Sequence, residues 1–147
     1  MIEIIWGLKT HALMDVWTIE HVLSGLSIGH AVKKRNHKVF KQKLNIEASS
    51  INTRHFDLLG VLFLAYLWES LEHYLEVGLA GLKVEYWFQG VEMWGNRLIF
   101  DPLMLVIGYL IAKRYPKLVI PARILSALWL IVHIFIFPDS MYLHEIF

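Results

Sequence analysis

Four ionisable residues at helical spacing carry the strongest chemical signal in the sequence. Glu69, Glu72, His73 and Glu76 lie close together in an otherwise apolar stretch. On an α-helix they occupy one arc of about 100°, so their side chains share one face. Carboxylate and imidazole groups gathered in this way can bind a divalent metal or relay protons. We interpret Glu69, His73 and Glu76 as functional, whereas Glu72 can also be explained as an acid that faces the adjoining outer loop.

The chain has three further apolar stretches, which contain additional acids, histidines and an arginine. If these stretches cross a lipid bilayer, we place these residues at the same depth as the first group, in the outer half of the bilayer. The acids of this set are Glu20, Glu69, Glu72, Glu76 and Asp101, and its permanent cation is Arg97. Carboxylates in a low-dielectric site cannot all ionise against one guanidinium, so some must be protonated or a cation must be bound. Glu, Asp and His are ligands of zinc, iron and manganese, which makes a divalent metal a candidate cofactor.

Two overlapping sets of site residues follow from this convergence. The predicted catalytic set is Glu69, His73, Glu76, Arg97 and Asp101, and the predicted metal ligands are His21, Glu69, His73, Glu76 and His133. Simpler interpretations stay open for some members. Arg97 and Asp101 are four residues apart and can form a structural ion pair at a helix entrance. His133 stands alone on an apolar helix and can be a hydrogen-bond partner between helices.

The elements that must position these residues are four apolar stretches, approximately 12–32, 56–79, 97–114 and 118–137. Apolar residues make up 56% of the 147 residues, charged residues 18%, and the mean hydropathy is +0.49. A soluble domain of this size has too little interior for so much apolar surface, and a spanning helix needs about 20 mostly apolar residues. The sequence therefore predicts an all-α fold, with one integral membrane domain over residues 1–147 built as a four-transmembrane-helix bundle.

The basic residues indicate the orientation of this predicted bundle. Eleven of the 14 Lys and Arg lie in two segments, residues 33–54 and 113–123, which four spans place on the same side. Because basic loops are cytoplasmic, both termini are predicted to lie outside. The connection over residues 84–96 is rich in Trp, Tyr and Phe, and we interpret it as an interfacial aromatic segment or a lid over the site. Gly25 and Gly29 predict a close helix contact.

The order of these features resembles that of VanZ-like small polytopic membrane proteins. The matching positions are an acid of the second helix, Glu69 or Glu72, followed by Arg97, Asp101 and Gly108 of the third, within residues 12–112. Two positions depart from that pattern, because Leu105 lies where an asparagine is expected and no glutamine stands beside the second-helix acid. The resemblance implies a bacterial protein of the cytoplasmic membrane, with periplasmic or extracellular termini, that acts near the cell envelope.

Other features narrow the classes of function. The chain has no cysteine, which excludes disulfides and thiolate metal sites, and its net charge of +1 argues against nucleic-acid binding. Two functions stay open. The first is a protein of the lipid bilayer that binds a cation, handles protons or serves as a subunit of a homo-oligomer or larger membrane complex. The alternative is a metal-dependent membrane enzyme acting on a lipid or envelope substrate, whose anionic head group would pair with Arg97.

Overall fold

The structure is a computed structural model that describes residues 2–45 and 51–136, and the regular structure of this part of the chain is all-helical. The α-helices are α1 (Ile2–Ile5), α2 (Thr18–Val39), α3 (Ile51–Glu76), α4 (Leu82–Phe88), α5 (Asp101–Arg114) and α6 (Val119–Ile131). Short π-helical segments adjoin them at η1 (Phe40–Leu44), η2 (Asn96–Phe100) and η4 (Val132–Ile136), and a 3-10 turn, η3 (Pro116–Leu118), precedes α6.

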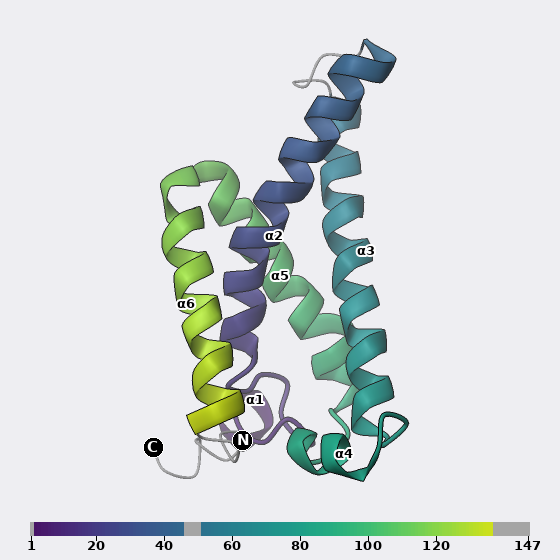
Figure 1. Ribbon diagram of the computed structural model, residues 1–147, viewed down its shortest axis with the longest axis vertical. Coiled ribbons are helices and arrows are strands. Elements are labelled where there is room, and N and C mark those ends of the chain that lie inside the picture. Colours follow the sequence, from purple (N-terminus) through teal and green to yellow (C-terminus); the bar gives the residue numbers. More distant parts are fainter. Residues whose placement is uncertain (1, 46–50, 137–147) are drawn as a thin grey trace.

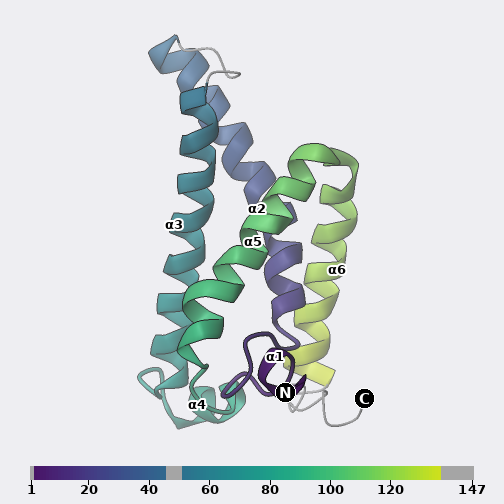
Figure 2. The same cartoon turned by 180° about the vertical axis from the view of Figure 1, so that it is seen from behind.

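The helices are arranged around α5. α2 and α3 form a long antiparallel pair, which α5 crosses from behind in Figure 1 and from the front in Figure 2, while α6 packs along α2. The first apolar cluster joins α2, α5 and α6 through Leu26, Ala112, Val119 and Ala122, and the second joins α3 and α5 through Val61, Ala65, Leu105 and Tyr109. Burial of apolar surface thus fastens α5 to three other helices. α1 and α4 lie at the end of the bundle where α2 begins and α3 ends.

Glycines that face each other allow α2 and α5 to cross closely. A Cβ atom at Gly25 would lie 2.0 Å from the carbonyl oxygen of Leu105, and one at Gly108 would lie 2.2 Å from that of Val22. These neighbours are backbone atoms, so a side chain at either glycine would force the helices apart. The close contact predicted from Gly25 and Gly29 is confirmed. It holds the part of α2 from Val22 to Gly29 against the middle of α5, from Leu105 to Tyr109.

The prediction of a four-helix transmembrane bundle is wrong. Within residues 2–45 and 51–136, no helix combines the length and the apolar character that crossing a bilayer requires. α5 and α6 have 14 and 13 residues, which is about 20 Å of helix against a hydrocarbon core of about 30 Å. α2 and α3 have 22 and 26 residues, but both carry several charged side chains. The predicted place in a bacterial cytoplasmic membrane, with both termini outside, depended on these spans and is corrected with them.

The four predicted stretches nevertheless overlap the main helices. Stretches 12–32 and 56–79 overlap α2 and α3, 97–114 nearly coincides with η2 and α5, and 118–137 covers α6 and η4, with residue 137 outside the described residues. Residues 12–17 are not helical. The aromatic segment 84–96 contains most of α4 followed by an irregular connection, in which Gln89 and Gly90 have positive φ angles. Its interpretation as a membrane-interface segment depended on the predicted transmembrane helices and is corrected together with them.

Candidate metal centre

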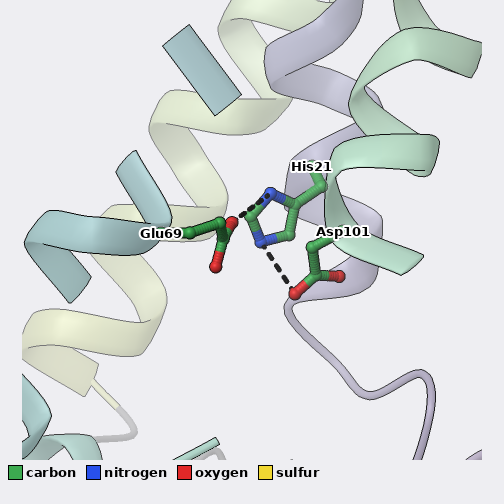
Figure 3. A group of neighbouring side chains, drawn as sticks. All are labelled: His21, Glu69 and Asp101. Carbon is green, nitrogen blue, oxygen red and sulfur yellow. Dashed lines mark ion pairs between the residues drawn. The ribbon is translucent and has the colours of Figure 1, made fainter. Parts of the chain in front are cut away.

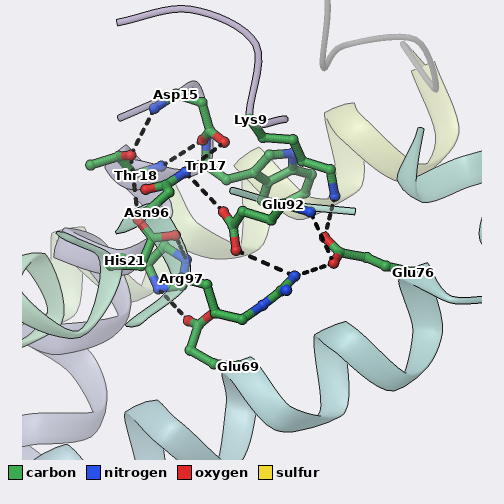
Figure 4. A network of polar contacts seen from close by, with 11 residues as sticks. Lys9, Asp15, Trp17, Thr18, His21, Glu69, Glu76, Glu92, Asn96 and Arg97 are labelled. Carbon is green, nitrogen blue, oxygen red and sulfur yellow. Dashed lines mark hydrogen bonds and ion pairs between the residues drawn. The ribbon is translucent and has the colours of Figure 1, made fainter. Parts of the chain in front are cut away.

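The end of the bundle that carries α1 and α4 has a polar interior. Glu69, Glu76, Asn96 and Asp101 are among its largest buried side chains, each with 2% of its surface exposed or less. They come from the last third of α3 and the start of the η2–α5 helix, and α2 meets them with His21 (Figure 4). Buried carboxylates are costly unless they are paired, protonated or bound to a cation. Each acid in this region therefore needs a partner.

Asp15 determines how α2 enters this region. Its Oδ1 accepts hydrogen bonds from the backbone N–H groups of Trp17 (2.6 Å) and Thr18 (3.2 Å) at the beginning of the helix. In return, the Thr18 hydroxyl accepts a hydrogen bond from the backbone N–H of Asp15 (2.9 Å), as in a capping box. The same hydroxyl donates to Oδ1 of Asp101 (3.4 Å). The cap thus ties the start of α2 to the start of α5, and His21 follows within the next turn.

His21, Glu69 and Asp101 form the first of two buried groups, here named the His21 cluster (Figure 3). The imidazole lies between the two carboxyl groups. Its Nδ1 is 3.8 Å from Oε1 of Glu69, and its Nε2 is 3.3 Å from Oδ2 of Asp101. The three residues belong to α2, α3 and α5, so the cluster depends on the packing of these helices.

Most carboxyl oxygens of the His21 cluster lack a hydrogen bond from a donor group within the described residues, although Oδ1 of Asp101 accepts one from Thr18. Both side-chain oxygens of Glu69 are buried without a hydrogen bond to any residue that the structure describes, whereas the Asp101 carboxyl group shares a side-chain hydrogen bond with Glu92. Burial raises the pKa of Glu69 to about 9, with a further increase from the Glu72 carboxyl, and burial also raises the pKa of Asp101. Burial lowers the pKa of His21 to about 4, so the imidazole is neutral at pH 7 and can act as a ligand.

Glu72, Glu76 and Glu92 form the second group, the Glu76 cluster, which contacts permanent cations. Nζ of Lys9 donates to Oε1 of Glu76 at 2.5 Å, and Nη2 of Arg97 donates to Oε2 of the same carboxylate. Nη2 of Arg97 also lies 3.7 Å from Oε2 of Glu92, whose backbone N–H donates to Oε2 of Glu76 at 3.2 Å. Burial raises the pKa of Glu72 to about 7 against the opposing effect of Lys9, and burial also raises the pKa of Glu92.

Both clusters could hold a metal ion. In each, one ligand atom from every residue lies within 4.8 Å of the other two. Ligand atoms around a tetrahedral ion are about 3.4 Å apart when each bond is about 2.1 Å, so the ligand atoms would move toward one another on binding. The clusters differ in charge, because Lys9 and Arg97 already pair with acids of the Glu76 cluster. An added cation would be repelled there, which makes the His21 cluster the better metal site.

The structure brings the predicted metal ligands together in part. His21 and Glu69 meet, and Asp101, which the sequence places in the catalytic set, completes their cluster. Glu76 lies in the other cluster. Arg97, the remaining member of the catalytic set, forms its ion pairs with Glu76 and Glu92.

Two predicted histidine ligands lie outside both clusters. His73 is exposed, and its Nδ1 accepts a hydrogen bond from Nη1 of Arg97 at 3.0 Å. His133 is 1% exposed and packs against the rings of Trp17 and Trp129, with centroids 5.0 and 4.5 Å away. His73 therefore shares the polar face of α3 without entering its buried part.

Sequence reasoning missed Lys9, Asp15, Glu92 and Asn96. Asn96 joins the parts of the network, because its Nδ2 donates to Oε1 of Glu92 (2.9 Å) and to Oδ2 of Asp15 (3.2 Å). The excess of acids over cations was a usable signal for Lys9, since it calls for a second buried cation and Lys9 lies outside the two basic segments. Asp15 and Glu92 precede helices in irregular segments, where no periodic pattern marks a buried face.

Comparisons with protein-family models, with curated proteins and with solved structures find no match for this chain. The resemblance to VanZ-like proteins stays a prediction, because nothing in these comparisons bears on it. The candidate site is therefore defined by the geometry and charge of the residues described above.

Proposed function

We propose that this protein binds one divalent metal ion through His21, Glu69 and Asp101. The observation that carries the proposal is the buried carboxyl group of Glu69 beside His21, both of whose oxygens lack a hydrogen-bond partner in the described part of the chain. A divalent cation would neutralise both carboxylates and compensate the cost of burying them. The hydrogen bond from Thr18 to Oδ1 of Asp101 would orient that ligand.

The donor set favours zinc, iron(II) or manganese(II). One imidazole nitrogen and carboxylate oxygens suit borderline and hard cations, and the chain has no cysteine to select a softer one. By the general order of affinities, zinc should bind more tightly than iron(II) or manganese(II). Zinc is therefore the first ion to test.

The number of ligands favours a catalytic metal over a structural one. Structural zinc sites have four protein ligands, whereas catalytic sites have three and leave a position for water or substrate. A metal with such an open position activates water or polarises a substrate oxygen. His21 also lines a cavity of about 600 Å³, so a molecule in that cavity would lie beside this metal ligand.

The test is metal binding by the full chain after treatment with a chelator. Zn²⁺, Mn²⁺ and, without oxygen, Fe²⁺ are titrated by calorimetry, and bound metal is counted by mass spectrometry of the elements. We expect one ion per chain. The substitutions His21→Gln, Glu69→Gln and Asp101→Asn should each lower the metal affinity by about 100-fold or more. Loss of a group that only hydrogen-bonds a metal ligand already lowers affinity by about 10- to 100-fold, and loss of the ligand itself should cost more.

Glu72→Gln and His73→Gln are the matched controls, because both residues lie on the same helix face as Glu69. Each control should still bind one ion per chain. If the wild type binds no more metal than Glu69→Gln while circular dichroism shows both to be helical, the metal site is refuted.

A second candidate function is proton transfer by the same three residues. It is favoured by the position of the imidazole, which has a carboxyl group next to each ring nitrogen. Carboxyl groups placed in this way orient a histidine for general acid–base catalysis. This function needs no metal, so the titration separates the two candidates: a chain that binds no ion leaves proton transfer as the better explanation of the cluster.

A further inference from the structure

An apolar cavity of about 600 Å³ lies between α2, α3, α4 and α6, with Leu105 of α5 in its wall. Eleven of its sixteen lining residues are apolar. Small-molecule sites have volumes of about 300–1,000 Å³ and combine apolar walls with a few well-placed polar groups. Trp68 and Leu71 line this cavity and are 47% and 51% exposed, which gives a ligand an entrance from the surface.

The cavity is elongated along the helices. Its wall runs from Leu64 to Leu75 on α3 and, in the opposite direction, from Trp17, directly before α2, to Ile28 on α2. Each stretch corresponds to about 16 Å of helix at about 1.5 Å per residue. A linear alkyl chain laid parallel to the helices would match both this length and the apolar wall.

Glu20 supplies a fixed polar group in the wall. The residue is 8% exposed, and Oε1 of its carboxyl group accepts hydrogen bonds from the hydroxyl groups of Ser24 (3.1 Å) and Ser126. These two bonds hold the carboxyl group between α2 and α6. The other oxygen, Oε2, is buried and has no hydrogen-bond partner among the described residues. A donor group on a ligand would satisfy it, and an unsatisfied buried acceptor is otherwise costly.

The charges in the wall select the head group of such a ligand. The polar residues that line the cavity are Glu20, His21, Ser24, Glu72 and Ser126, so this lining contains acids but neither Lys nor Arg. An anionic head group would be buried beside carboxyl groups without a cation, whereas a hydroxyl or amino group can donate to Glu20. We propose that the cavity binds an elongated alkyl molecule whose hydroxyl or amino head group donates a hydrogen bond to Glu20. This site adjoins the proposed metal ligands but does not require a bound metal.

The test uses metal-free protein and three ligands that differ in their head groups: dodecylamine, dodecanol and dodecanoate, each below its micelle concentration. Trp17, Trp68 and Trp87 line the cavity, so binding is followed by tryptophan fluorescence and its stoichiometry by native mass spectrometry. We expect saturable binding of one dodecylamine or one dodecanol per chain. Dodecanoate should bind about tenfold more weakly or worse, which corresponds to about 1.4 kcal/mol.

Variants distinguish the cavity from the rest of the surface. Leu71→Trp fills the cavity and should abolish binding of all three ligands, whereas Leu59→Trp, on the same helix but outside the cavity, should bind like the wild type. Glu20→Gln should weaken dodecylamine binding by about tenfold, because the amide removes the charge and an acceptor oxygen.

Three results would overturn the proposal: no binding of dodecylamine or dodecanol, equal affinity for dodecanoate and dodecylamine, or unchanged binding by Leu71→Trp. Zinc titration of the same variants gives an independent readout. Leu71→Trp keeps all three metal ligands and should bind zinc like the wild type, which also shows that it is folded. The cavity proposal and the metal proposal can therefore fail separately.

Discussion

The two acidic clusters meet at the same end of the bundle but are balanced in opposite ways. In the Glu76 cluster, Lys9 and Arg97 supply permanent positive charges within contact of the acids. In the His21 cluster, the nitrogen donor is a neutral imidazole, and both carboxyl oxygens of Glu69 lack hydrogen bonds to the described residues. A buried carboxylate with fixed cations is complete within the chain, whereas one without them requires a proton or an added cation. The Glu76 cluster has two permanent cations for its three acids, whereas the His21 cluster has none for its two within residues 2–45 and 51–136, which makes the His21 cluster the candidate for function.

Removing a cation from the Glu76 cluster should have the largest effect. Arg97→Met leaves Glu76 and Glu92 without their shared guanidinium, and removing one partner of a buried ion pair costs about 3–5 kcal/mol. We expect a decrease of that size in the free energy of unfolding, measured by urea denaturation of the metal-free protein. Arg123→Met, at an exposed arginine, is the control and should change it by less than about 0.5 kcal/mol. A similar small change in Arg97→Met would mean that the Glu76 cluster does not depend on its cations.

Adding a cation to the His21 cluster should have the opposite effect. Zinc at 100 times its Kd should stabilise the folded chain by about 2.7 kcal/mol, because it binds that state and not the unfolded one. The measurement is the Tm with zinc and with a chelator. Asp101→Asn should lose the increase, and Glu72→Gln should keep it. An equal increase in wild type and Asp101→Asn would place the ion elsewhere in the protein.

Separating α2 from α5 should disturb the His21 cluster. The Cβ atom of Gly108→Ala would meet the carbonyl oxygen of Val22 at 2.2 Å, and overpacking of this kind costs about 1–3 kcal/mol. Because His21 and Asp101 lie on these two helices, zinc affinity should also fall. Gly95→Ala is the control, since its Cβ would meet the ends of two side chains at 3.1 Å. Equal losses of stability and zinc affinity in the two variants would contradict the role of the α2–α5 crossing.

A change in pH should give the most gradual effect. The Glu69 carboxyl has a pKa of about 9 in the folded chain and 4.5 as its ordinary value, so unfolding releases its proton between these pH values. Stability of the metal-free protein should therefore fall as the pH rises from 6.5 to 9. His21, with a pKa lowered from 6.5 to about 4, has the opposite effect but only below pH 6.5.

The measurement for this prediction is the urea midpoint across that pH interval. Glu69→Gln removes one of the titrating carboxyl groups and should make the decrease less steep, while Glu72, Glu92 and Asp101, whose pKa values are also raised by burial, maintain the rest of it. A midpoint that stays constant or rises with pH in the wild type would show that Glu69 is already ionised in the folded state.

The sequence predicted the positions of the helices better than it predicted whether these helices cross a membrane. Apolar stretches with helical spacing mark the main helices because periodicity is a local property of the chain. Apolar content, however, does not state whether a side chain is covered by another helix or exposed, and 56% apolar residues led to spans that the helices are too short or too charged to form. The shared polar face of α3 was predictable for the same local reason.

The sequence also predicted that acids would exceed cations in the set of Glu20, Glu69, Glu72, Glu76, Asp101 and Arg97, although the whole chain has 14 Lys and Arg against 13 Asp and Glu. Only the tertiary structure decided which acids remain without a cation. Lys9 and Glu92 reach the Glu76 cluster from segments distant in sequence, and His21 and Asp101 reach Glu69 through the glycine crossing of α2 and α5. The physical reason is that the charge of a side chain follows from its residue type, whereas the neutralisation of that charge depends on distances of a few ångströms between helices.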